Sequence, residues 1–121
     1  MKIPGPDHPI TITPSKDRVR VRFNGKVIAD SKRALVLQEA AYKPVLYIPR
    51  ADAQMAMFER TTNSTHCPYK GDASYYTIKV GDRAAENAIW SYETPFPAMK
   101  EIGGHLAFYP NRVDSIEVSP E

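Results

Sequence analysis

The chain has 121 residues, of which 42% are hydrophobic and 25% are charged, and this composition excludes a protein that is disordered along most of its length. Sixteen basic and fourteen acidic residues leave a formal net charge of +2, so the overall charge does not require a nucleic-acid or membrane partner. A single cysteine, Cys67, excludes an intramolecular disulfide framework and a four-thiolate zinc site.

Residues 1–14 contain four prolines and no apolar run of signal-peptide length, so we predict an extended or loosely docked N-terminal arm. Residues 15–121 contain no linker, internal repeat or low-complexity segment, and their length fits a single domain. No apolar run reaches the roughly 18 residues that a membrane-spanning helix needs. Together with the unpaired thiol, these features predict a cytoplasmic protein without a membrane partner.

The clearest local pattern is a hairpin early in the chain. Residues 18–23 alternate arginine with apolar side chains, as in a strand with one buried face. Asn24 and Gly25 follow, and both accept the positive φ of a tight hairpin turn. Residues 26–29 are predicted to return as the second strand.

Residues 31–42 support two interpretations. Ser31 suits a helix N-cap, and the alanines, leucines, glutamine and glutamate that follow favour a helix. The alternating leucines of the same stretch, followed by residues 45–48, equally suit a pair of strands. Farther along, Asp52 is predicted to cap a short helix that carries Met55, Met57, Phe58 and Glu59.

The second half of the chain is again strand-like. Residues 74–80 are β-branched and aromatic, and residues 87–92 are predicted to return beside them after a long turn at 81–86. One helical turn and two further strands are predicted over residues 98–102, 105–109 and 113–118. We therefore expect six to eight short strands in one small, mainly β domain, folded as two packed antiparallel sheets or an incomplete barrel with one or two short helical turns.

Residues 65–72 bring a thiol, an imidazole, a phenol, an ammonium and a carboxylate into eight positions. Pro68 suits the second position of a β-turn, which places Cys67 and Lys70 at the two ends of that turn. A nearby cation stabilises a thiolate, so the turn predicts either a reactive thiolate or an anion pocket formed by Lys70 and the turn amides. The alternative is an inert buried cysteine next to a solvated lysine.

Aromatic side chains gather in the strands predicted around this turn. Six of the seven tyrosines lie in or beside those strands, together with the single tryptophan. The candidate walls of a pocket for a flat ligand are Tyr47, Tyr69, Trp90, Tyr92 and Tyr109. The alternative is that these rings only fill a β core. Asp52 either caps its helix or adds a catalytic carboxylate to Cys67 and Lys70.

Three arginines of the hairpin, Arg18, Arg20 and Arg22, are the main nucleic-acid signal, because a basic strand face can follow a row of phosphates. Arginine also solubilises an exposed strand, and with a net charge of only +2 we do not expect a nucleic-acid partner. The histidines are isolated and lack metal-ligand spacing, so no metal is predicted, and any other cofactor is unknown. The GxGxxG, GxxxxGK[ST], HExxH and GxSxG motifs are absent from the sequence.

The chain contains the segments ADSKRAL, VLYIPRAD, THCPYKGDASYY, AIWSYETP and LAFYPNRVD. Together they resemble a widespread, mainly bacterial family described as domain of unknown function 427, over about residues 15–118. The resemblance implies a single small, mainly β domain with a strand rather than a helix at 33–38. A nucleotidyltransferase label sometimes attached to the family is not carried over, because the paired acids that would hold magnesium are missing. The family motif marks Tyr47, Pro49, Asp52, Cys67, Tyr69, Lys70, Gly71, Trp90, Tyr92, Phe108 and Tyr109.

The leading hypothesis is a domain with a small-molecule-binding pocket built around the CPYKG turn, either a binding protein or an enzyme that acts on an anionic ligand. In this hypothesis Lys70 pairs with the anion, and Cys67 and Asp52 are the candidate catalytic partners. The alternatives are a thiol enzyme centred on Cys67, and a non-enzymatic adaptor that binds RNA or protein through the arginine face. An edge strand in so small a sheet also suits a symmetric homodimer.

Overall fold

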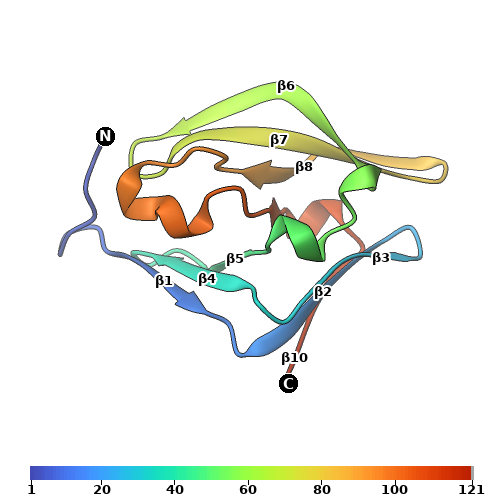
Figure 1. The fold of residues 1–121 in the computed structure, drawn as a ribbon, viewed down its shortest axis with the longest axis horizontal. Helices are drawn as coiled ribbons and strands as arrows, with labels where there is room; N and C mark the ends of the chain where they lie inside the picture. The colour runs from blue at the N-terminus through green and yellow to red at the C-terminus, as the bar shows by residue number, and fades with distance from the viewer. Residues whose placement is uncertain (121) are drawn as a thin grey trace.

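Over residues 1–120, which the computed structural model describes, the chain forms ten β-strands and four short 3-10 helices. The last residue of the expected domain, Glu121, lies outside the described residues. The strands form three antiparallel sheets, and within residues 1–120 these do not close into a barrel. The expectation of a mainly β, antiparallel fold is confirmed, but the described residues form ten strands rather than the expected six to eight. In Figure 1, strands β6, β7 and β8 of the four-stranded sheet form the upper layer, and the strands of the two three-stranded sheets lie below it.

The first sheet has the strand order β1-β4-β5, formed by β1 (Ile10–Pro14), β4 (Leu35–Glu39) and β5 (Val45–Tyr47). Residues 35–39 are therefore a strand, as the family resemblance implies, and the helical interpretation of this stretch is wrong. The reason is tertiary, because β4 pairs along one edge with β1 and along the other with β5. β1 lies within the segment expected as an arm.

The second sheet has the order β10-β2-β3, formed by β2 (Asp17–Phe23), β3 (Lys26–Ser31) and β10 (Ser115–Pro120). The predicted hairpin is confirmed: Asn24 and Gly25 connect β2 to β3 with φ values of 48° and 78°, the positive values that a type I′ turn requires. The side chains of Val19, Val21 and Phe23 in β2 are buried, while the arginines of this strand are half-exposed.

The third sheet has the order β6-β7-β8-β9, formed by β6 (Phe58–Cys67), β7 (Gly71–Val80), β8 (Arg83–Ser91) and β9 (Ala107–Phe108). The long turn predicted at 81–86 is wrong, because β8 begins at Arg83 and pairs there with Val80. Only two residues therefore separate β7 from β8. A tight turn with Gly81 at φ 61° makes this possible.

The prediction that Asp52 caps one short helix carrying Met55, Met57, Phe58 and Glu59 is also wrong. The structure has two separate 3-10 turns, η1 (Arg50–Asp52) and η2 (Met55–Met57), and Phe58 already begins β6. Phe58 pairs with Ile78 of β7, and its ring meets the Phe108 ring edge-on at 6.0 Å. Pairing and packing at the sheet outweigh the local helix preference of this stretch.

Two groups of buried side chains hold the layers together. One lies between the β2–β3 hairpin and the four-stranded sheet and includes Val21, Ile28 and Ile89. The other lies between the first sheet and β7–β8, and η3 (Pro97–Ile102) adds Met99 and Ile102 to it. The last 3-10 turn, η4 (Pro110–Arg112), connects β9 to the final strand. Across residues 1–120, no helix has the length and apolar character required to span a membrane.

Candidate functional site

The turn between β6 and β7 directs one charged side chain into the protein. Cys67 pairs with Gly71 across the hairpin, so Pro68, Tyr69 and Lys70 form the connection. Gly71 has a φ of 109°, which favours glycine because other residues are strained there. The Lys70 carbonyl accepts a 2.9 Å hydrogen bond from the amide of Phe96. With its backbone held in this way, the Lys70 side chain is buried, with 6% of the residue exposed.

Inside, the Lys70 ammonium meets a carboxylate, a thiol and an aromatic ring. Its Nζ lies 2.5 Å from Oε1 of Glu39, at the end of β4. It also lies 3.8 Å from the Cys67 sulfur and 6.0 Å from the centre of the Tyr92 ring. The predicted approach of the two turn ends, Cys67 and Lys70, is thus present in the structure.

Glu39 connects the Lys70 turn to the N-terminal segment. While Oε1 accepts from Lys70, Oε2 lies 2.8 Å from Nε2 of His8. Burial acts to raise the pKa of the Glu39 carboxyl, but the hydrogen bonds from Lys70 and His8 outweigh burial and hold that pKa below its usual value. Glu39 is therefore a carboxylate at neutral pH.

A cavity of about 310 Å³ opens beside this ion pair. It lies where β4, β5, β7 and β8 meet the segment after β9. Its lining combines the ion pair with six aromatic rings and consists of Leu37, Glu39, Tyr42, Lys43, Val45, Tyr47, Lys70, Tyr75, Trp90, Tyr92 and Tyr109. The turn and four of the five aromatic residues selected from the sequence therefore converge on one hollow.

The rings of the cavity are fixed by contacts with one another. The Trp90 indole N–H donates to the Tyr47 hydroxyl at 3.3 Å, and the Trp90 and Tyr109 rings lie 4.5 Å apart between centroids. Burial raises the pKa of the Tyr47 and Tyr92 phenols, and burial with a bond to Tyr75 raises the pKa of Tyr109 to about 12. At neutral pH these phenols keep their protons and can donate hydrogen bonds.

Three of the residues selected from the sequence lie outside the lining. Asp52 is at the end of η1, where it accepts hydrogen bonds from Ser31 and Arg33 in a separate surface hollow. Tyr69 stacks on His8 instead of facing the cavity. Cys67 is half-buried, contacts the Lys70 Nζ and packs against the buried cluster that includes Tyr47 and Tyr92.

The sequence did not predict Glu39 or His8 as site residues. In the structure Glu39 lines the cavity, and His8 binds Glu39. A signal for Glu39 was present, because Leu35, Leu37 and Glu39 alternate and therefore share one face of β4. Leu37 and Glu39 both line the cavity. No comparable pattern marks His8, which reaches Glu39 because β1 pairs with β4 and brings the preceding segment to that end of the sheet.

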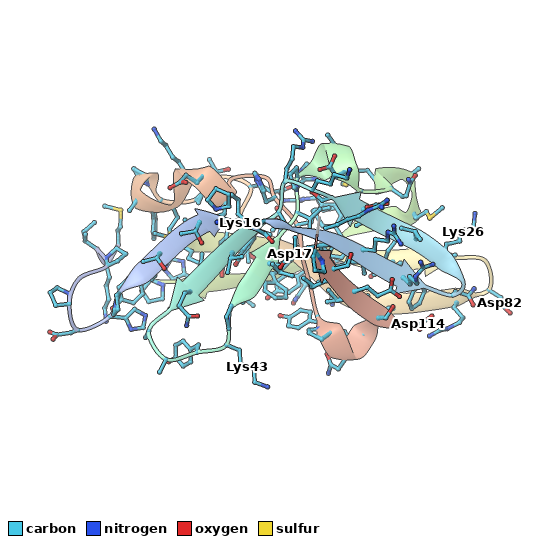
Figure 2. All side chains as sticks on the ribbon, turned by 90° about the horizontal axis from the view of Figure 1, so that it is seen from below. Lys16, Asp17, Lys26, Lys43, Asp82 and Asp114 are labelled. Atoms are coloured by element: carbon cyan, nitrogen blue, oxygen red, sulfur yellow. The ribbon has the colours of Figure 1, made fainter. Side chains whose placement is uncertain are left out.

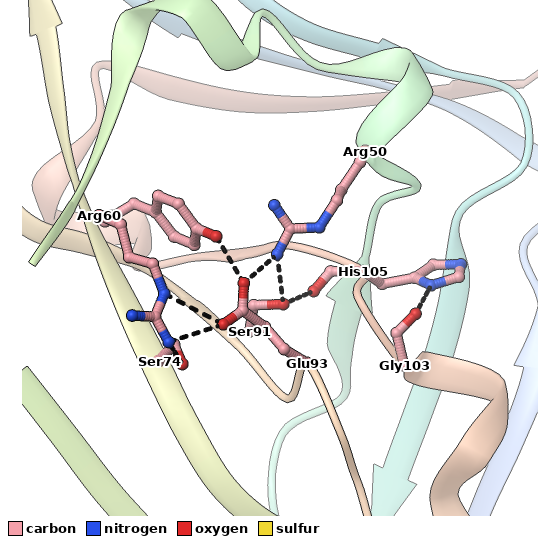
Figure 3. A network of polar contacts seen from close by, with 8 residues as sticks. Arg50, Arg60, Ser74, Ser91, Glu93, Gly103 and His105 are labelled. Carbon is pink, nitrogen blue, oxygen red and sulfur yellow. Dashed lines mark hydrogen bonds and ion pairs between the residues drawn. The ribbon is translucent and has the colours of Figure 1, made fainter.

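A second polar network lies around Glu93, just after β8 (Figure 3). Arg50, Arg60 and the Tyr76 hydroxyl donate to its two oxygens at 2.6–3.1 Å. Burial acts to raise the pKa of Glu93, but interactions with Tyr76, Ser74 and Arg60 outweigh burial and lower that pKa to about 2. The network joins η1 to the four-stranded sheet, and each of its charged groups already has a partner.

The arginine face of β2 is paired with acids on the neighbouring strands. Arg18 and Arg20 reach Asp30 of β3 at 2.7 and 3.7 Å. Arg22 reaches Glu117 of β10 at 2.9 Å. These cross-strand pairs are the arrangement expected of a solvated sheet surface, and they reduce the positive charge available to a nucleic-acid backbone.

In the part of the chain that the structure describes, no three His, Cys, Asp or Glu side chains are grouped so that they could hold a metal ion.

Comparison with protein families gives one match, to the model described as "Domain of unknown function (DUF427)", over residues 11–119. No curated protein matches the chain.

Proposed function

The chain belongs to the family described as domain of unknown function 427, and we propose that this member binds a small organic anion in the aromatic cavity beside the CPYKG turn (residues 67–71). In this proposal residues 15–121 form one domain, and residues 1–14 are an arm whose strand β1 joins the first sheet of that domain. The protein works in the cytoplasm, where a reducing environment keeps the Cys67 thiol free. The observation that carries the proposal is a buried ammonium, Lys70, in the wall of a hollow.

The charges around the cavity favour an anion. Among the described residues, Lys43 and Lys70 line it together with Glu39, so two positive charges and one negative charge leave a formal charge of +1. An ammonium has three donors, and Lys70 directs two of them toward Glu39 and Cys67. A ligand oxygen can accept from the third. Lys43 projects outward from the loop between β4 and β5 (Figure 2), where it would attract an incoming anion.

The aromatic walls favour a ligand with a flat or hydrocarbon part. Burial raises the phenol pKa of Tyr47, Tyr92 and Tyr109 still further above neutral pH. These phenols therefore stay protonated and offer donors for ligand oxygens as well as apolar ring faces. The volume of about 310 Å³ is at the lower end of the roughly 300–1,000 Å³ typical of small-molecule sites. It suits a compact ligand with one ring or a short chain.

The test is a thermal-shift screen of small carboxylates and phosphates against the wild-type protein and Lys70→Met. We expect at least one class of acid to raise the melting temperature of the wild type, and Lys70→Met to remove that shift. Lys79→Met is the matched control, because Lys79 lies near the far end of β7, away from the Lys70 turn, and is exposed and paired with Glu59. This variant should keep the full shift.

Because Lys70→Met leaves the Glu39 carboxylate short of a partner, a double variant, Glu39→Gln with Lys70→Met, checks that any loss comes from ligand binding rather than from misfolding. This variant removes both charges of the pair and should fold yet still give no shift. A ligand shift that survives in the folded double variant would show that Lys70 does not hold the anion, and the proposal would fail.

A second candidate function is thiol chemistry at Cys67, with Lys70 as the group that stabilises the thiolate. The observation that favours it is the 3.8 Å separation between the Cys67 sulfur and the Lys70 Nζ. It predicts rapid labelling of the native protein by iodoacetamide below pH 7, and much slower labelling of the Glu39→Gln, Lys70→Met double variant. Labelling only in denaturant would reject it.

A further inference from the structure

A second hollow, of about 240 Å³, lies on the other side of β5. It is formed where β5 faces β2, β8, β9 and β10, and all ten of its lining side chains are apolar. Val21, Ile48 and Phe108 belong to the buried core at its base, while Leu46 and Ile116 are half-buried. We call this hollow the apolar groove.

The apolar groove and the Lys70 cavity share two lining residues, Val45 and Trp90. β5 separates them by ordinary strand alternation, since Tyr47 lines the cavity while Leu46 and Ile48 line the groove. The end of β9 is divided in the same way, because Phe108 of β9 lines the groove while Tyr109, the next residue, lines the cavity. The half-buried Trp90 ring therefore lies at the junction of a charged hollow and an apolar one.

We propose that the two hollows form one site for an anionic amphiphile, with its acid group at Lys70 and its hydrocarbon chain across Trp90 in the apolar groove. This inference rests on the proposed function and specifies its ligand class. The cavity supplies a formal charge of +1 for the head group, whereas the groove provides only apolar side chains. A polar group placed in the groove would lose its water without gaining a partner, so the part of the ligand that fits there is hydrocarbon.

The sizes of the two hollows support a shared occupant. The apolar groove, at about 240 Å³, is smaller than typical small-molecule sites, which begin at roughly 300 Å³. Joined to the cavity of about 310 Å³, it falls within that range. A ligand with a head and a tail uses both volumes, while a compact acid leaves the groove empty.

The experiment uses the single tryptophan of the sequence, Trp90, as a fluorescence reporter at the junction. Butanoate, hexanoate and octanoate are titrated into the full chain, with octanol as a probe that has the tail without the charge. Each buried methylene contributes about fourfold in affinity, so we expect octanoate to bind on the order of a hundredfold more tightly than butanoate, allowing for incomplete burial of the chain. Octanol should bind more weakly than octanoate.

Two variants test the binding of the ligand's acid group and the binding of its hydrocarbon chain separately. The Glu39→Gln, Lys70→Met double variant should weaken all three acids by a similar factor and keep the gain with chain length. Leu46→Ser should leave butanoate unchanged and remove most of the gain with chain length. Met57→Ser is the matched control, because Met57 is also half-buried against the same core but lines neither hollow.

The outcomes distinguish this inference from the proposed function. If butanoate and octanoate bind equally and both depend on Lys70, the amphiphile inference is overturned and the binding of small anions stands. If Leu46→Ser and Met57→Ser reduce the gain equally, the tail does not lie in the groove, which also overturns it. If sedimentation shows a dimer that Leu46→Ser dissociates, and chain length has no effect, the groove is an interface between copies of this chain and the inference fails.

Discussion

The imidazole of His8 lies flat on the ring of Tyr69, with the centroids 4.3 Å apart and an angle of 10° between the planes. The same imidazole binds Glu39 through Nε2, and the backbone amide of Lys2 donates to the carbonyl of Pro68 at 2.7 Å. The N-terminal segment thus contacts both the CPYKG turn and the carboxylate that holds Lys70. This arrangement makes the segment part of the support of the candidate site.

Replacing His8 should therefore loosen this support. His8→Ala removes a stacked aromatic pair and a hydrogen bond to a carboxylate, and we expect a loss of about 1–2 kcal/mol in the free energy of unfolding. Chemical denaturation measures that loss, and limited proteolysis should cleave near residues 1–9 earlier than in the wild type. The control is His66→Ala, since His66 pairs with Asp72 on the exposed surface and should cost less than about 0.5 kcal/mol. Equal costs for the two variants would contradict the role of His8.

The Glu39–Lys70 ion pair predicts strong non-additivity. Lys70→Met leaves a partly buried carboxylate that, among the described residues, keeps only His8 as a partner, so we expect a cost of about 3 kcal/mol, at the lower end for a broken buried pair. Adding Glu39→Gln removes the stranded charge, and the double variant should be more stable than Lys70→Met alone. Urea denaturation of the two single variants and the double variant measures the coupling. Additive costs would mean that the pair contributes nothing specific to stability.

Stability should fall as the solution becomes acidic, and Glu93 is the best marker of this effect. Its pKa is lowered from 4.5 to about 2 in the folded protein, where Tyr76, Ser74 and Arg60 favour the ionised form against burial. A carboxyl with a depressed folded pKa contributes stability above its unfolded pKa and loses that contribution as pH falls through the folded pKa. The free energy of unfolding should therefore decrease between pH 5 and pH 2, the window set by these two values. Glu93→Gln should flatten this slope, while the exposed Glu59→Gln should not; identical slopes would exclude Glu93 as the source.

Gly71 should resist substitution because of its backbone conformation. Its φ of 109° strains any residue with a Cβ, although the nearest atoms that a Cβ would meet lie at ordinary contact distance, 3.6 Å or more. We expect Gly71→Ala to cost on the order of 1–3 kcal/mol and to weaken ligand binding, because Gly71 follows Lys70 directly. Gly5→Ala has open space and no such φ, so it should be neutral within about 0.5 kcal/mol. A Gly71→Ala protein as stable as Gly5→Ala would show that the turn can adopt another geometry.

Local sequence determined the features that depend on neighbouring residues. The β2–β3 hairpin follows from Asn24 and Gly25, whose positive φ values close the turn regardless of what packs on it. The approach of Lys70 to Cys67 follows in the same way from a proline-led turn of four residues. The mainly β character follows from the many prolines and the β-branched and aromatic strands.

Tertiary structure decided which distant segments meet. Glu39 lies 31 residues from both His8 and Lys70 in the chain, and only the pairing of β1 with β4, together with the stacking of the layers, brings the three side chains into contact. The same packing leaves Asp52 with Ser31 and Arg33 rather than at the cavity. Side-chain alternation shows which residues share a face of a strand, but the facing partner is set by the burial of apolar surface over the whole chain. For this reason the turn and its aromatic neighbours could be predicted from the sequence, while the carboxylate that holds Lys70 and the apolar groove behind Trp90 emerged only from the fold.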